Sequence, residues 1–163
     1  MSNLRHVKGL SDLQKFLDTL PVKMERNVLR GAMRAGANVV KPVAQAKINS
    51  RSGELARSLK VRSSARGGKV TAMVYTRVFY AKFVEYGTKA HRIEAGEGAL
   101  AVGTGFAPSV EHPGSDPHPF MRPALDTQAG AAVVAAGEYI KRRLASKHGL
   151  DTADITIEEE PGL

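Results

Sequence analysis

Apolar residues recur at helical spacing in two long stretches of the chain. From Val22 to Ile48 the apolar and small positions step by seven, which places them on one face of a long helix. A second long helix is predicted from about Phe120 to Lys147, with Pro123 in its first turn. The expected apolar stripe of this second helix consists of Leu125, Ala129, Val133, Ala136, Ile140 and Leu144.

The first long stretch follows a short predicted helix, 11–20, and contains residues that weaken a helix. Pro42 cannot donate a backbone hydrogen bond, so we expect the helix to kink or divide near Asn38. Gly31 and Gly36 lack side chains and would allow another element to approach closely, at some cost in helix stability.

After this stretch the pattern changes to alternation. Glu54–Ser58 is long enough for one helical turn, and Leu59–Arg62 and Val70–Tyr75 alternate as half-buried strands do. The polar segment Ser63–Gly68, which ends in two glycines, is a suitable hairpin connection. The chain is therefore predicted to be α+β, with a small antiparallel sheet packed against the long N-terminal and C-terminal helices.

The stretch Phe79–Thr88 is rich in aromatic residues. The spacing of Phe79, Phe83 and Tyr86 fits one or two turns of helix, and Gly87 is suited to end it. We expect these aromatic side chains to form an apolar wedge at a hinge of the core.

A glycine-rich insertion, 89–116, separates this stretch from the second long helix. Short strands are predicted over 91–93, 99–102 and 106–110. Loops of this length inside a compact domain are uncommon and tend to be functional or disordered. Two interpretations stay open, an arm that reaches a neighbouring subunit and an extended hairpin with no contact of its own.

Charge is distributed unevenly along the chain, whose formal net charge is +8. All 24 lysines and arginines precede residue 149, whereas five acidic residues follow it. A basic body suggests an acidic partner, either nucleic acid or an acidic protein surface, although a basic helix face can also serve solubility alone. The candidate contact residues on the first long helix are Arg26, Arg30, Arg34 and Lys41.

The composition is that of one soluble domain folded in a reducing compartment. The chain has 163 residues and no cysteine, so it cannot form a disulfide. Residues 1–10 lack the apolar run of a signal peptide. The most apolar window, 129–136, is far shorter than the roughly 20 residues that span a bilayer.

The residues do not predict a catalytic or cofactor site. The chain has no nucleophile elbow, no P-loop and no complete dinucleotide fingerprint. Glu85 has no second acid or histidine fixed near it by spacing, so a surface or inter-subunit carboxylate is the expected role. The remaining ligand candidates match no common metal-site spacing; they are His91, Glu111, His112, Asp116 and His118.

Four elements, taken in order, resemble the "gene product ten-like" tail-component family of lambdoid, long-tailed phages. They are Arg34–Val40, Ser52–Leu59, Tyr80–Thr88 and Pro119–Leu125. The sequence departs from the family's pattern at Ser52, where threonine is usual, and by carrying the insertion.

The resemblance implies a structural virion protein of the phage neck or tail, without enzymatic activity or cofactor. Such a protein would complete the tail and join it to the head, as a ring of several copies around the DNA path. Its expected partners are other neck proteins, tail tube or terminator proteins, copies of itself and, without sequence preference, genomic double-stranded DNA. It would reside in the virion neck or tail, and in the host cytoplasm during assembly, without membrane contact.

The predicted interface lies in two segments, Phe79–Thr88 and Pro119–Leu125. It consists of Phe79, Tyr80, Phe83, Glu85, Tyr86, Phe120 and Arg122. We expect residues 1–150 to form a single tail-component domain, with 89–116 as its insertion, and 151–163 to form an acidic mobile tail. The alternatives are a basic nucleic-acid-binding module without sequence preference, and a tail terminator or minor tail protein.

Overall fold

The computed structural model describes residues 14, 18, 22–49, 53–96, 98–148 and 156–158. The chain divides into two units. The small unit is 78–119, and the large unit consists of the described residues before and after it. Of the helix predicted over 11–20, only Gln14 and Asp18 are described, and the rest lies outside the described residues.

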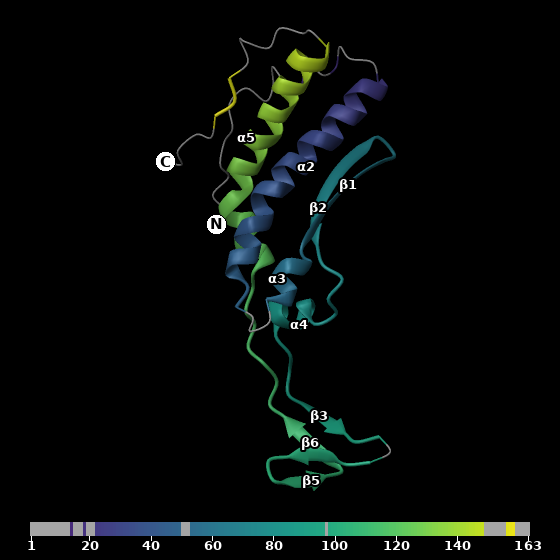
Figure 1. Cartoon of the computed structure of the whole chain (residues 1–163), viewed down its shortest axis with the longest axis vertical. Helices are drawn as coiled ribbons and strands as arrows, with labels where there is room; N and C mark the ends of the chain where they lie inside the picture. Colours follow the sequence, from purple (N-terminus) through teal and green to yellow (C-terminus); the bar gives the residue numbers. More distant parts are fainter. Residues whose placement is uncertain are drawn as a thin grey trace. The chain divides into compact units, whose positions relative to one another are not determined.

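The predicted α+β class is confirmed. The large unit contains α2 (Val22–Lys47), α3 (Glu54–Ser58), β1 (Lys60–Arg66), β2 (Lys69–Tyr75) and α5 (Met121–His148), as Figure 1 shows. The small unit contains α4 (Ala81–Tyr86), β3 (His91–Glu94), β4 (Leu100–Val102), β5 (Gly105–Ala107) and β6 (Ser109–His112).

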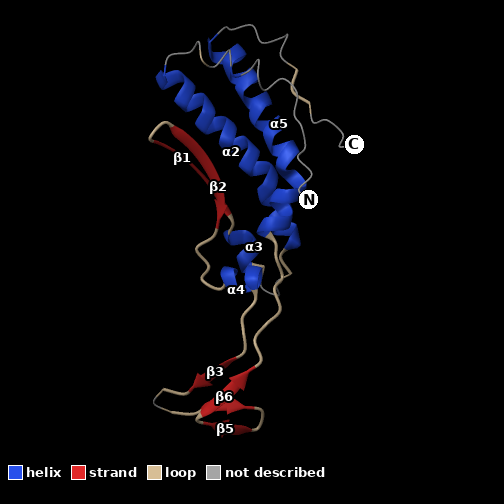
Figure 2. Ribbon diagram, turned by 180° about the vertical axis from the view of Figure 1, so that it is seen from behind, coloured by secondary structure: helices blue, strands red, loops and turns tan. Residues whose placement is uncertain are grey.

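The two long helices of the large unit, α2 and α5, pack side by side in opposite directions (Figures 1 and 2). Gly31 lies against the ring of Tyr139, and a Cβ atom on Gly36 would be 2.7 Å from the carbonyl oxygen of Ala132. The close approach predicted from these two glycines is therefore confirmed. Any larger residue at Gly36 would push the backbones of the two helices apart.

The core of the large unit lies between these helices. One cluster of buried residues there consists of Val28, Ala32, Ile140, Leu144 and Ile157. Ile157 belongs to the predicted mobile tail, of which the structure describes only 156–158, and its side chain contacts Gly137 of α5. At this described position the tail packs in the core.

The helix α2 runs without a break through Pro42, so the predicted division is wrong. Proline removes one backbone hydrogen bond, but helix stability in proteins comes mainly from packing of the helix face. Here α2 packs against α5, β1 and β2. Those contacts offset the loss of the hydrogen bond.

The predicted stripe of α5 is correct at its C-terminal end and wrong near its start. Ile140 and Leu144 are buried, but Leu125 and Val133 are exposed. The buried positions in the first half of α5 are Ala124 and Gly130. Because α2 and α5 approach closely, the smallest residues occupy the contact line and the larger ones lie beside it.

The predicted hairpin is confirmed, with longer strands than expected. β1 and β2 pair antiparallel over their whole length, and residues 63–66, predicted as turn, belong to β1. The turn is only Gly67-Gly68, with φ of 54° and 74°. Two consecutive left-handed residues are what a two-residue hairpin turn requires, and glycine adopts this conformation without strain.

Side-chain hydrogen bonds connect the short helix α3 to its neighbours. The amide Nε2 of Gln45 donates to the carbonyl oxygen of Ala56 at 2.7 Å, and the hydroxyls of Ser58 and Thr76 lie 2.6 Å apart. Leu55 and Leu59 are fully buried on either side of these bonds. In the described part of the chain, no helix is long and apolar enough to cross a membrane.

Candidate interaction surface

The short helix α4 exposes its aromatic residues. Ala81 and Glu85, one turn apart, are buried, whereas Phe79, Phe83 and Tyr86 are exposed on the opposite side. Gly87 ends the helix as predicted, and its N–H donates to the carbonyl oxygen of Phe83 at 2.9 Å. The predicted apolar wedge in the core is therefore wrong, because the inward positions of this helix are an alanine and a glutamate.

These aromatic residues form a face that is held in place by local contacts. Phe79 is 79% exposed and Tyr86 is 78% exposed. The ring of Phe79 meets that of Tyr80 edge to face at 5.5 Å, and the ammonium group of Lys82 lies 4.9 Å from the centre of the Phe83 ring. We call Phe79, Phe83 and Tyr86 the aromatic face.

The two ends of the insertion pair with each other beside this face. Thr88 and Ser115 exchange two backbone hydrogen bonds of 2.9 and 3.1 Å, and the N–H of His118 donates to the carbonyl oxygen of Val84 at 2.8 Å. A Cβ atom on Gly87, which has φ of 71°, would be 2.5 Å from the carbonyl oxygen of Ser115. Glycine is therefore required here for both its conformation and its size.

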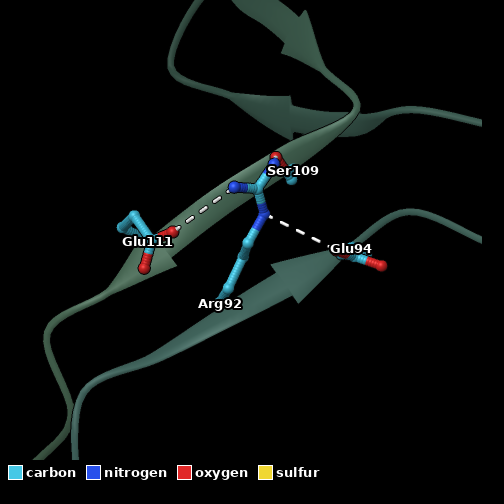
Figure 3. Close-up of polar contacts among 4 residues, drawn as sticks. All are labelled: Arg92, Glu94, Ser109 and Glu111. Carbon is cyan, nitrogen blue, oxygen red and sulfur yellow. Dashed lines mark hydrogen bonds and ion pairs between the residues drawn. The ribbon is translucent and has the colours of Figure 1, made fainter.

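The ribbon formed by β3 and β6 has one charged face (Figure 3). Arg92 lies opposite Glu111 in the register. Its guanidinium donates to the hydroxyl of Ser109 at 2.7 Å and lies 3.6 Å from Glu94 and 3.9 Å from Glu111. These side chains are mostly exposed, so the ion pairs orient Arg92 more than they stabilise the fold.

The other face of this ribbon is apolar and carries two histidines. Ile93 pairs with Val110, and the rings of His91 and His112 lie 5.1 Å apart. The Nδ1 atom of His91 lies 2.9 Å from the carbonyl oxygen of Lys89, to which its N–H donates. The N–H of Gly114 donates to Nδ1 of His112 at 3.0 Å, which orients the ring of His112.

An open hollow connects the aromatic face with this apolar face. Its volume is about 540 Å³, within the range of known binding sites, and its walls are largely apolar. Its lining residues are Phe83, Gly87, Thr88, Lys89, His91 and His112. The hollow has the size and lining to receive an apolar side chain from another protein.

The tip of the insertion is a second, smaller hairpin made of β4 and β5. The third predicted strand, 106–110, is divided at Pro108, and its halves pair with different strands, β4 and β3. Phe106 at this tip is 80% exposed and Val102 is also exposed. Two-stranded ribbons cannot cover both of their faces, so apolar residues on them stay accessible.

The residues that were predicted to form one interface differ in their exposure. Phe79, Phe83 and Tyr86 are exposed, Tyr80 is half-buried and Glu85 is buried. In the large unit, Phe120 is 2% exposed and Arg122 is exposed. Of the basic set on α2, Arg26, Arg30 and Arg34 are exposed and Lys41 is half-buried. Within the described residues, no three histidines or acids lie close enough to hold one metal ion.

Sequence reasoning missed Ile93, Val102 and Phe106, which extend the apolar surface of the small unit. A signal was available for Phe106, a large aromatic residue between Gly105 and a short hairpin strand in a glycine-rich segment. No signal existed for Ile93, because its exposure depends on how β3 pairs.

Comparison with known proteins gives a match in the N-terminal part of the chain. The family model described as "Bacteriophage HK97-gp10, putative tail-component" matches residues 11–87. The matched range contains α2, α3, the β1–β2 hairpin and α4, and it ends at the glycine that terminates α4. The resemblance to this tail-component family is thus confirmed over 11–87, which is slightly less than half of the chain, and the match supports a structural tail role. No curated protein and no solved structure gives a significant match.

Proposed function

We propose that the protein completes the tail of a long-tailed phage and joins it to the DNA-filled head, as one subunit of a ring around the DNA path. The family match supports a tail component, and the small unit supports a joining role. Within the described residues, six of the ten exposed large apolar side chains lie in this 42-residue unit, between Phe79 and Phe106. Exposed apolar patches of this kind mark protein–protein contact sites.

In this proposal the small unit of one copy contacts a neighbouring protein of the neck. The aromatic face and the hollow beside Phe83 form the central contact, because aromatic residues in partly enclosed sites dominate interface energies. Phe106 at the tip of the insertion would reach a second partner, either the next copy or an adjacent ring. This is the arm interpretation of the insertion. Glu85 and Phe120 are not part of the proposed contact, because both are buried.

Head-to-tail contact between copies uses a different surface on each side of the subunit, and it forms a closed ring when the rotation between successive copies closes. The small unit offers one such surface, and the exposed side chain of Arg122 offers a charge outside it. The proposed partners are therefore copies of this chain, other neck proteins and the tail tube or terminator.

The test is electron microscopy of particles from an induced or infected culture that lacks this gene. The proposal predicts DNA-filled heads beside unattached tails of normal length. Tails of abnormal length would show a role in termination instead, and complete infectious particles would overturn the joining role.

A further inference from the structure

The β1–β2 hairpin of the large unit has two chemically different faces. Directly paired residues of an antiparallel pair lie on the same face, and successive residues alternate. One face is half-buried and consists of small apolar residues and one serine: Val61, Ser63, Ala65, Val70, Ala72 and Val74. Because the hairpin packs on α2, this is the face toward the helix. The other face is turned outward.

The outward face of the hairpin is cationic. Its pairs are Lys60 with Tyr75, Arg62 with Met73, Ser64 with Thr71, and Arg66 with Lys69. All four basic side chains are exposed, and the face contains no acidic residue. Among the described residues, none of the four forms an ion pair. We call this surface the cationic ribbon.

We propose that the cationic ribbon binds the phosphate backbone of duplex DNA, without reading its sequence. A two-stranded β-ribbon has the width that the major groove of duplex DNA, about 12 Å wide, admits. Successive residues on one face of a strand are roughly 6.7 Å apart, so Lys60, Arg62 and Arg66 present charges at intervals along one line. The hydroxyls of Ser64 and Thr71, 3.0 Å apart, lie between the cations and can also donate to phosphate oxygens.

The composition of the ribbon favours phosphate over an acidic protein surface. Protein interfaces are enriched in aromatic residues, methionine and arginine and depleted in lysine and serine, whereas phosphate contacts come from arginine, lysine, serine and threonine. Six of the eight outward side chains of the ribbon belong to the phosphate-contacting types, and the other two are Met73 and Tyr75. Arg142 and Arg143 are exposed on another element, α5, and provide a matched control.

The experiment measures binding of the full chain to a fluorescent duplex of about 30 base pairs by anisotropy, across a series of salt concentrations. Each phosphate contact contributes about −0.9 to the slope of log association constant against log salt. Four contacts predict a slope of about −3.6. A duplex of different sequence should give the same affinity and slope.

The deciding comparison uses two double variants with the same change of net charge. Arg62→Gln with Arg66→Gln should make the slope less steep by about 2. Arg142→Gln with Arg143→Gln, on exposed positions of α5, should leave the slope within about 0.5 of the original. Circular dichroism of both variants checks that the fold is retained.

Three results would overturn the proposal. Equal losses in both double variants would mean that net charge alone attracts DNA. Absence of binding by the unmodified chain at low salt would exclude the duplex as a ligand. Equally tight binding of poly-glutamate, lost by the same ribbon variants, would assign the surface to an acidic protein instead.

Discussion

The large and small units differ in how far their apolar residues are buried. In the large unit, close packing of α2 on α5 buries Val28, Ala32, Ile140 and Leu144. In the described part of the small unit, Ala81 is the single buried apolar residue, and the aromatic face is exposed. The large unit therefore has a core of its own, whereas the small unit leaves most of its large apolar side chains exposed.

The largest effect on stability is expected from Leu144→Ala. Leu144 is fully buried, so its truncation should leave a cavity and lower the free energy of unfolding by about 2–5 kcal/mol. Denaturant unfolding followed by circular dichroism measures this loss. The matched control is Leu125→Ala on the same helix, where the leucine is 55% exposed and the change should stay within about 0.5 kcal/mol. Equal losses at both positions would contradict the assigned face of α5.

A smaller loss is expected from Gly36→Ala. The added methyl group meets the backbone of Ala132, which cannot move as a side chain could, and overpacking of this kind costs about 1–3 kcal/mol. Alanine favours the helix by up to about 1 kcal/mol, so the net change should still be destabilising. Thermal unfolding compares it with Asn38→Ala at an exposed position of α2, which should not lower stability. Stabilisation by Gly36→Ala would refute the close approach.

Arg92→Ala should have a still smaller effect. Its ion pairs with Glu94 and Glu111 are exposed and long, so their loss should lower the free energy of unfolding by no more than about 1 kcal/mol. The same denaturant titration measures it. A loss above about 2 kcal/mol in the free energy of unfolding would mean that the ion pairs of Arg92 hold β3 and β6 together.

The smallest effect on stability is expected from Phe79→Ser combined with Tyr86→Ser. Both side chains are mostly exposed, so each substitution should change the free energy of unfolding by less than about 0.5 kcal/mol. A combined loss above about 2 kcal/mol would place these rings in a core and remove the contrast between the two units.

The sequence predicted local structure better than it predicted burial. The hairpin turn at Gly67-Gly68, the single turn of α3 and the end of α4 at Gly87 each depend on the conformations of nearby residues, and all are confirmed. Burial depends on which elements meet. The exposure of Phe79 and the exposure of Leu125 could not be read from spacing, because spacing shows which residues share a face but not which face is covered.

The candidate site was predicted only in part, because part of it also depends on which elements meet. The aromatic residues of 79–86 were found because they are concentrated in a short stretch. The hollow beside Phe83 depends on the pairing of His91 with His112 across β3 and β6, twenty-one positions apart in the chain. The cationic ribbon was missed because residues 63–66 were assigned to a turn, which hid the alternation of Arg62, Ser64 and Arg66.

We propose that the exposed aromatic face serves assembly and not folding. The most direct test is to supply Phe79→Ser with Tyr86→Ser to a phage lacking the gene, and to count complete particles by electron microscopy. Leu125→Ser, which also replaces an exposed apolar residue, is the control. We expect full heads and unattached tails with the double variant, and normal particles with the control. Normal particles with both would contradict it.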